Sequence, residues 1–274
     1  MLTKTNIMIL RLNKLFIVLL LVLNISCAQR EQKAFSFVQI CDTQLGMGGY
    51  EHDLKLFQLA VKQINDLNPD FVVICGDLVN TACDSSYSDF QKIKNGFNMP
   101  CYCAPGNHDV GVKPSDKALS YYRQTIGADY YEFQNKGCSF IVTNSALWKS
   151  YVKDESEKHD AWFKETIKKI SLKSNPVFVI GHYPLYLKEF GEKENYFNIP
   201  LVKRSELLDL FIQNNVVAYI SGHAHMTVIN NYKNIRLVSG ETTCNNFDNR
   251  PFGFRLWKVS SDTIKQHFVP LQNK

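Results

Sequence analysis

From residue 35 onward, short, mainly apolar segments alternate with segments whose apolar residues recur every three or four positions. The mainly apolar segments predict buried strands, namely Phe35–Cys41, Phe71–Cys75, Tyr102–Ala104, Ser139–Thr143, Val177–Ile180 and Val216–Ile220. The three- and four-residue spacing predicts helices over residues 54–64, after Asp53 as the N-cap, and over residues 161–170 and 205–212. This alternation indicates an α/β protein with a largely parallel or mixed sheet.

After Thr227 the pattern changes to short strands without intervening helices. These predicted strands are Thr227–Ile229, Arg236–Ser239, Phe254–Val259 and Thr263–Val269. Neither a linker rich in Pro, Gly or Ser nor an internal repeat interrupts residues 35–270. We therefore expect one domain, spanning residues 34–274.

The N-terminal 26 residues have the pattern of a signal peptide. Basic residues precede the apolar run Leu15–Leu23, whose nine residues are too few for a bilayer span of about 20. The following segment, residues 24–27, resembles a bacterial lipobox, in which Cys27 would carry the lipid and residues 27–33 would form a tether. We expect an exported bacterial lipoprotein, periplasmic or at the cell surface, whose membrane contact is the lipid anchor. Plain secretion with a nearby cleavage is the alternative.

Composition narrows the class of protein only modestly. Hydrophobic residues make up 45% and charged residues 21% of the chain, which excludes intrinsic disorder and collagen-like sequence. The formal net charge of +5 falls to +2 without residues 1–26, which hold three basic residues and no acidic one. No run of basic residues predicts a nucleic-acid-binding arm. Seven cysteines besides Cys27 cannot all pair, and the sequence assigns no disulfide.

Polar motifs follow five of the predicted strands. They are Asp42-Thr43-Gln44, Gly76-Asp77, Gly106-Asn107-His108-Asp109, Gly181-His182 and Gly222-His223-Ala224-His225. Ligands of open α/β sheets bind beyond the carboxyl ends of the strands, so these motifs can converge on one place. Carboxylate, amide oxygen and imidazole suit divalent ions such as Mn, Fe and Zn, and the glycines admit ligands closely. The sequence therefore predicts a metal site.

The order of these motifs resembles the calcineurin-like metallophosphoesterase superfamily, from Phe35 to about Pro270. The resemblance implies a four-layer α/β/β/α sandwich and two divalent metal ions, of Mn, Fe, Zn or Mg. It implies ligand roles as follows: Asp42 and His225 on the first metal, Asp77 bridging both, and Asn107, His182 and His223 on the second. His108 would act as a catalytic residue near the scissile phosphate, with Asp109 orienting it. A purely structural hydrogen bond is the alternative for His108.

Two positions depart from the pattern of the superfamily. Gln44 stands where the first motif usually has His, and an amide oxygen binds Zn or Fe less strongly than imidazole. The first site would then be weaker, or would prefer a harder ion such as Mn or Mg. Asn80 stands where purple acid phosphatases place Tyr, which argues against that subgroup. The Asp-x-Gln variant resembles a narrower branch of calcineurin-like phosphoesterase domain-containing Ser/Thr phosphatases.

Substrate contacts are predicted from two segments. Tyr183 and Tyr196 lie in the aromatic-rich segment that follows His182, and Arg250 can pair bidentately with a phosphate. Packing under a surface loop and a plain surface Arg are the alternatives. The resemblance implies metal-dependent hydrolysis of phosphoric esters by a metal-activated hydroxide. The expected substrates are phosphomonoesters, either small molecules or phosphoproteins. A phosphodiesterase or nucleotidase on the same metals is one alternative, and a catalytically weakened surface-binding lipoprotein is the other.

Overall fold

The computed structural model describes residues 33–172 and 175–272. The predicted signal peptide, Cys27 and the predicted tether up to residue 32 lie outside the described residues. Within the described ranges, no helix combines the length and the apolarity needed to cross a membrane.

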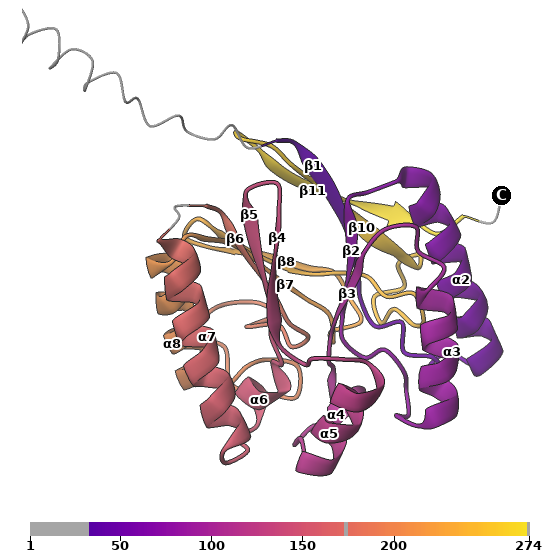
Figure 1. The fold of residues 1–274 in the computed structure, drawn as a ribbon, viewed down its shortest axis with the longest axis horizontal. Helices are drawn as coiled ribbons and strands as arrows, with labels where there is room; N and C mark the ends of the chain where they lie inside the picture. Colours follow the sequence, from indigo (N-terminus) through magenta and orange to yellow (C-terminus); the bar gives the residue numbers. More distant parts are fainter. Residues whose placement is uncertain (1–32, 173–174, 273–274) are drawn as a thin grey trace, which may run out of the picture. The chain divides into compact units, whose positions relative to one another are not determined.

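Two mixed sheets form the centre of the domain (Figure 1). The first sheet has the order β11 (Ile264–Pro270), β10 (Gly253–Val259), β1 (Phe35–Ile40), β2 (Phe71–Cys75) and β3 (Cys101–Ala104). The second has the order β4 (Tyr131–Asn135), β5 (Cys138–Val142), β6 (Val177–Ile180), β7 (Val216–Ser221), β9 (Ile235–Ser239) and β8 (Val228–Tyr232). Strands β1, β2 and β3 pair in parallel, as do β5, β6, β7 and β9. The carboxyl ends of these parallel strands therefore lie at the same end of each sheet.

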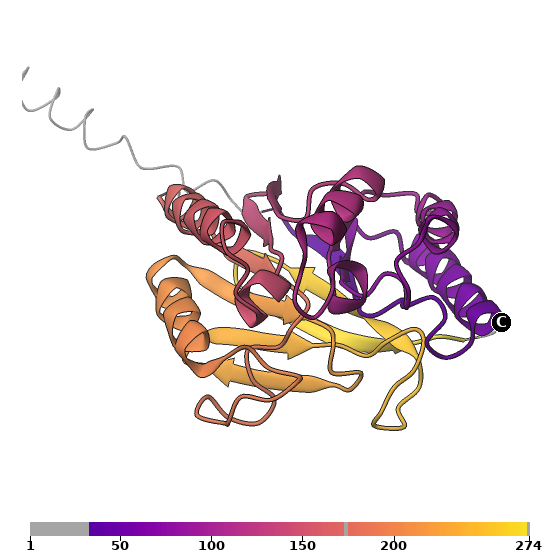
Figure 2. The ribbon, with the colours of Figure 1, turned by 90° about the horizontal axis from the view of Figure 1, so that it is seen from below.

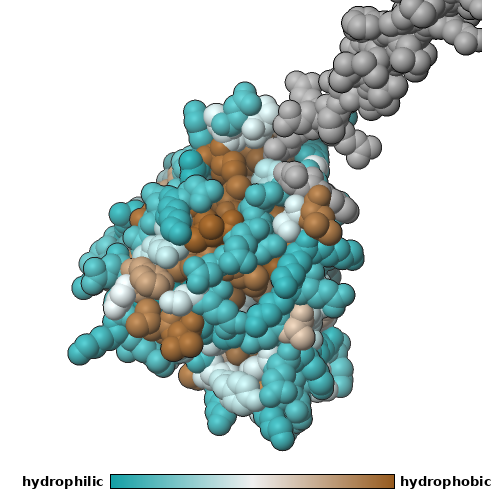
Figure 3. Space-filling model, turned by 90° about the vertical axis from the view of Figure 1, so that its left-hand side faces the viewer, coloured by the Kyte–Doolittle hydropathy of each residue, from teal (hydrophilic) through white to brown (hydrophobic). Residues whose placement is uncertain are grey.

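Helices cover the outer faces of both sheets (Figures 1 and 2). Beside the first sheet lie α2 (Tyr50–Leu67) and α3 (Asp84–Lys94), and beside the second lie α7 (Glu155–Ser171) and α8 (Leu201–Gln213). The shorter helices are α4 (Asn107–Val110), α5 (Asp116–Thr125) and α6 (Ala146–Lys149). The predicted four-layer α/β/β/α arrangement is confirmed. Figure 3 shows the side carrying α7 and α8, where hydrophilic residues surround patches of apolar ones.

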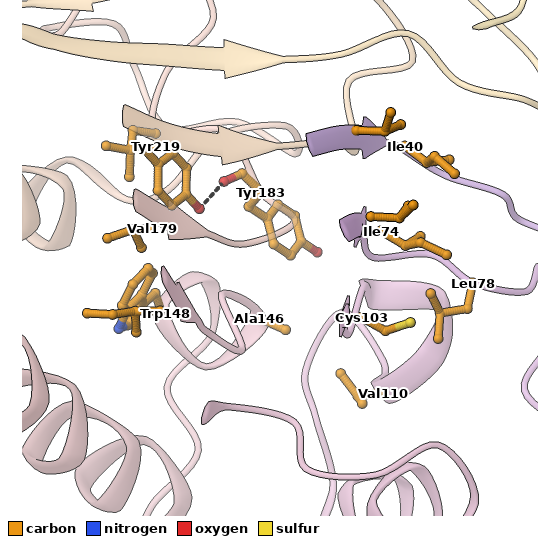
Figure 4. Close-up of a cluster of buried hydrophobic side chains, with 14 of the residues drawn as sticks. Ile40, Ile74, Leu78, Cys103, Val110, Ala146, Trp148, Val179, Tyr183 and Tyr219 are labelled. Atoms are coloured by element: carbon orange, nitrogen blue, oxygen red, sulfur yellow. Dashed lines mark hydrogen bonds between the residues drawn. The ribbon is translucent and has the colours of Figure 1, made fainter. Parts of the chain in front are cut away.

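An aromatic cluster fills the space between the sheets. The ring of Phe37 stacks on Phe71 at 5.0 Å and on Trp257 at 5.5 Å, and meets Phe140 edge-on at 5.6 Å. The next residue, Val38, belongs to a second apolar cluster, part of which Figure 4 shows. Because consecutive residues face different apolar clusters, the inner strands are buried on both faces, which explains the mainly apolar segments in the sequence.

The sequence pattern located most strands to within about two residues and missed five elements, of which α4 and α6 have only four residues each. Strand β4 was missed because its residues are alternately half-buried and exposed, and α3 and α5 have weakly apolar sequences. The prediction of Asp53 as an N-cap was wrong, since α2 begins earlier, with Gly49 at its N-cap. Buried Asp53 instead accepts hydrogen bonds from the backbone amides of Gly46 at 2.9 Å and Gly48 at 3.0 Å.

Candidate metal centre

The motifs at the ends of β1, β2, β3, β6 and β7 come together in space. Their ligand atoms form two buried groups, Asp77 with His182 and His223, and Asp42 with Asp77 and His225. Within each group these atoms lie within 4.8 Å of one another. The Oδ1 atom of Asn107 joins the first-named group at 3.0 Å from His182 Nε2. One carboxylate, that of Asp77, therefore belongs to both groups.

A backbone carbonyl fixes the ring of each of the three histidines. His182 Nδ1 lies 2.8 Å from the carbonyl oxygen of Cys75, His223 Nε2 lies 3.3 Å from that of Tyr196, and His225 Nδ1 lies 2.6 Å from that of Asn245. A carbonyl oxygen only accepts, so each of these ring nitrogens carries a proton. The opposite nitrogens, Nε2 of His182, Nδ1 of His223 and Nε2 of His225, face the group and are the ring atoms that could bind an ion.

These inward-facing atoms fit a divalent cation. His182 Nε2 and His223 Nδ1 are 3.1 Å apart, and an oxygen of Asp77 lies 3.3 Å from the former. Such a set of electron-pair donors repels itself unless a positive charge lies among them. Burial disfavours charge on His182, but the carboxylate of Asp77 outweighs it and raises the pKa of His182 to about 9. The site therefore attracts positive charge, and its oxygen and nitrogen donors are those of borderline divalent ions.

The second group is organised around Asp42. Its carboxylate accepts from the backbone amide of His223 at 3.0 Å and lies 3.6 Å from Nε2 of His225. Burial raises the pKa of Asp42 to about 6, against the opposing charges of His225 and His182. Buried Gln44 donates from Nε2 to Asn80 at 3.3 Å, and its Oε1 lies 4.0 Å from Sγ of Cys244. The backbone amide of Gln44 donates to the carbonyl oxygen of Asp77 at 2.8 Å, and coordination of a metal by the Gln44 side chain stays a prediction.

Five of the candidate ligands have left-handed backbone angles. Their φ values lie between 31° and 66°, at Asp42, Gln44, Asp77, His223 and His225. Residues other than glycine adopt this region at a cost of about 1–3 kcal/mol each, and such residues cluster at functional sites. The turn after each strand is therefore strained in the way that directs its side chain toward a common point.

Two motif glycines are required by close approach of these carboxylates. A Cβ added at Gly222 would lie 2.6 Å from Asp42 Oδ2, and one added at Gly106 would lie 2.1 Å from Asp77 Oδ1. No side chain fits there without displacing a candidate ligand. The prediction that these glycines admit ligands closely is confirmed.

His108 lies beside the site, but Asp109 does not orient it. His108 donates from its backbone amide to Asp77 Oδ1 at 2.8 Å, and its Nδ1 lies 2.8 Å from the carbonyl oxygen of Asn80. The expectation that Asp109 orients this ring was wrong. Asp109 is the third residue of α4, so its carboxylate turns back to accept from the amides of Gly106 at 2.8 Å and Leu78 at 3.2 Å. Burial and the charge of Asp77 raise the pKa of Asp109 to about 7.

The predicted substrate contacts differ in their exposure. Tyr183 has no exposed surface and its ring packs 4.2 Å from that of His223, so the structure does not support a substrate contact there. Arg250 is half-exposed, donates to Thr227 Oγ1 at 3.2 Å and lies 3.7 Å from Glu241, and its contact with a substrate stays a prediction. Tyr196 is 49% exposed, and its ring lies 4.9 Å from that of His223.

Sequence reasoning missed one exposed aromatic residue at the site. Phe247 is 48% exposed and its ring stacks on that of His225, with centroids 4.6 Å apart. The sequence held a weak signal for it, since Phe247 is a single large apolar residue within the polar segment 245–250. Phe247 and Tyr196 thus lie against different ligands, one from each group.

Comparisons with known proteins agree with this geometry. A sequence profile of the family described as "Calcineurin-like phosphoesterase" matches residues 35–227. The chain is 29% identical over 273 residues to the Serine/threonine-protein phosphatase CPPED1 of Bos taurus, covering 89% of this chain and 86% of that protein. It is 24% identical over 232 residues to the 3',5'-cyclic-nucleotide phosphodiesterase alr5338 of Nostoc sp., covering 78% and 83%.

One solved structure extends the agreement to the fold. The dimetal phosphatase LOC 393393 of Danio rerio superposes with a TM-score of 0.68 at 12% identity, covering 85% of this chain and 95% of that one. At 12% identity, this superposition shows that the fold is shared and nothing about function.

Proposed function

The chain belongs to the calcineurin-like phosphoesterase family, and on this basis we propose that it is a phosphomonoesterase whose substrates include phosphoproteins. As a member of this family it is a metal-dependent hydrolase of phosphoric esters. The observation that carries the proposal is the pair of buried ligand groups that share Asp77. The monoesterase assignment draws support from the CPPED1 relatives, which are named as Ser/Thr phosphatases.

The residues that would hold the two metal ions follow from the geometry. Asp77, Asn107, His182 and His223 would hold one ion, and Asp42, Asp77 and His225 the other, with Gln44 beside the latter. When bound, two such ions lower the pKa of a water nucleophile and neutralise charge on the phosphoryl oxygens. Mn, Fe, Zn and Mg all suit these donors, and Gln44 favours the harder ions of that set.

His108 is the proposed proton donor of the reaction. The carbonyl of Asn80 keeps the proton on Nδ1 and fixes the ring, while the backbone amide of His108 ties the residue to Asp77. In the doubly protonated ring, Nε2 is then the nitrogen that donates a proton to the leaving oxygen or a hydrogen bond to a phosphoryl oxygen. Asp109 supports this arrangement through the backbone, because it holds the amides of Gly106 and Leu78.

A phosphodiesterase is the second candidate function. It is favoured by the relative in Nostoc, which is named as a cyclic-nucleotide phosphodiesterase. A binding protein with weakened catalysis is the third candidate function. It rests on Gln44, which stands where the first motif of the superfamily usually has His.

One experiment separates these functions. The purified protein, reconstituted with Mn²⁺, is assayed on p-nitrophenyl phosphate, bis-p-nitrophenyl phosphate and a phosphoserine peptide, while bound Mn is counted. Turnover of the first and third substrates is expected. Turnover of the diester alone contradicts the monoesterase proposal, and absence of turnover with two bound ions favours the binding function.

We also propose that the protein is exported and anchored through a lipid on Cys27. The support is the signal-like segment of residues 1–26 and the lipobox-like residues 24–27. In a bacterial host, the wild-type chain should incorporate labelled palmitate and sediment with membranes, whereas Cys27→Ala should lose the label. A wild-type chain that is cleaved without taking up label would instead indicate plain secretion.

A further inference from the structure

Tyr196 contacts two of the candidate ligands of one ion. Its backbone carbonyl accepts from Nε2 of His223 at 3.3 Å, and its hydroxyl oxygen lies 3.4 Å from Nδ2 of Asn107. The first contact leaves Nδ1 of His223 facing the site, and the second turns Oδ1 of Asn107 the same way. The same residue keeps about half of its surface exposed to solvent.

The segment that carries Tyr196 has no regular secondary structure, but it is held tightly. Arg204, fully buried in α8, donates to the carbonyl oxygens of Phe190, Glu192 and Ile199. Burying a guanidinium costs free energy unless its N–H groups are hydrogen-bonded. Here those hydrogen bonds hold the backbone of the segment in one conformation. Preserving that shape is consistent with a role for a side chain that the segment presents.

A lysine fixes the backbone on both sides of Tyr196. Lys149 Nζ donates to the carbonyl oxygen of Asn195 at 2.5 Å and to that of Asn198 at 2.8 Å. The side chain of Asn198, which is fully buried, accepts from the amide of Asn195 at 2.9 Å. The position of Tyr196 relative to the ligands is therefore set before any substrate arrives.

The hydroxyl proton of Tyr196 has no acceptor among the described residues. The amide nitrogen of Asn107 can only donate, so the phenol oxygen is the acceptor in that contact. A phenol has an ordinary pKa of about 10, so the hydroxyl carries its proton at neutral pH. An oriented donor is thus left at the open side of the site, next to Asn107.

We propose that the Tyr196 hydroxyl donates a hydrogen bond to a non-bridging oxygen of the phosphoryl group, on the side of Asn107 and His223. This inference rests on the proposed phosphoesterase function and adds a phosphate-contacting residue to it. A fixed donor aimed at an oxygen that gains negative charge costs no reorganisation during the reaction, which is why such donors accelerate phosphoryl transfer.

Tyr196→Phe tests the inference, because it keeps the ring against His223 and the backbone carbonyl and removes only the hydroxyl. With Mn²⁺ and p-nitrophenyl phosphate, kcat is expected to fall on the order of 100-fold, the usual effect of one lost donor. Binding of inorganic phosphate to the Mn-loaded protein, measured by calorimetry, is expected to weaken about tenfold. Affinity for Mn²⁺ itself, titrated into the apo-protein, is expected to stay unchanged.

Tyr186→Phe is the matched control, since its hydroxyl lies in the same segment but donates to the carbonyl oxygen of Asn231 at 3.4 Å. It should behave as wild type. Unchanged kcat and phosphate affinity in Tyr196→Phe would overturn the inference. Weakened Mn²⁺ binding, with activity restored by excess Mn²⁺, would also overturn it, because Tyr196 would then act through Asn107. An inactive wild-type protein would count against the proposed function, while the phosphate-binding comparison would still decide about Tyr196.

Discussion

Gly222→Ala tests whether the carboxylate of Asp42 occupies the space of the missing side chain. The added methyl carbon would lie 2.6 Å from Asp42 Oδ2 and 2.9 Å from the carbonyl oxygen of Cys75, whereas ordinary contact begins at 3.4 Å. That carbonyl belongs to β2 and holds His182, so it resists movement. The carboxylate of Asp42 must therefore move by about 0.8 Å, which is the difference between 3.4 Å and 2.6 Å.

A displacement of this size exceeds what a catalytic site tolerates. Side chains of such sites have to stay within about 0.5 Å of their productive positions. A misplacement of about 1 Å costs on the order of 100-fold in rate. We expect kcat on p-nitrophenyl phosphate to fall by about 100-fold. The ion held by Asp42 and His225 should also bind more weakly, while the ion held by Asn107, His182 and His223 should stay bound.

Calorimetric titration of Mn²⁺ into the apo-protein separates the two sites, and urea unfolding checks that the variant folds. Gly191→Ala is the matched control, because a Cβ added there meets no atom within 4 Å. It should keep two ions and wild-type turnover. If Gly222→Ala bound both ions with wild-type affinity and turned over within about twofold of wild type, the steric argument would be refuted.

Three further predictions concern the proton donor, a buried histidine and the aromatic core. His108→Ala should lower turnover by about 10²–10⁴-fold with bound Mn unchanged, whereas loss of Mn would make His108 a structural residue. His159 is fully buried and its pKa is lowered by burial to about 4 from 6.5, so the unfolded chain binds its proton first as the pH falls and stability is lost between these values. From about pH 7.5 to about pH 4.5 this loss amounts to about 2.5 kcal/mol, and His159→Gln should lack that part of the pH dependence in urea unfolding. Phe37→Ala should lower the free energy of unfolding by about 3–5 kcal/mol, and a loss below about 1 kcal/mol would contradict the packing of Phe37 between the sheets.

Predictions from the sequence succeeded where the signal is local. The inner strands are mainly apolar in sequence because both of their faces are buried, and the bounds of β2 and β6 were predicted to the residue. The edge strand β4 gave no such signal, because only one of its faces packs against the protein. The roles of Asp109 and Tyr183 were misjudged for a different reason. Exposure and hydrogen-bond partners depend on residues that the local sequence does not contain.

The sequence by itself determined the kinds of ligand and their order along the chain. Oxygen and imidazole donors must follow strands whose carboxyl ends converge, and the residue types and strand pattern were visible without coordinates. Only the tertiary structure decided which ring nitrogen of each histidine faces the site. The carbonyl oxygen that fixes His182 belongs to Cys75, 107 residues away in the chain and on the other sheet.

The same holds for the two tyrosines that follow His182. Tyr183 and Tyr196 lie in one aromatic-rich segment of the sequence, and both were predicted to contact the substrate. Packing buries Tyr183 completely and leaves Tyr196 half-exposed beside Asn107. The difference arises because the buried Arg204 and the half-buried Lys149, from separate helices, hold the backbone of this segment in place. Chemical identity is a property of the local sequence, whereas the direction and exposure of a side chain are set by contacts between distant parts of the fold.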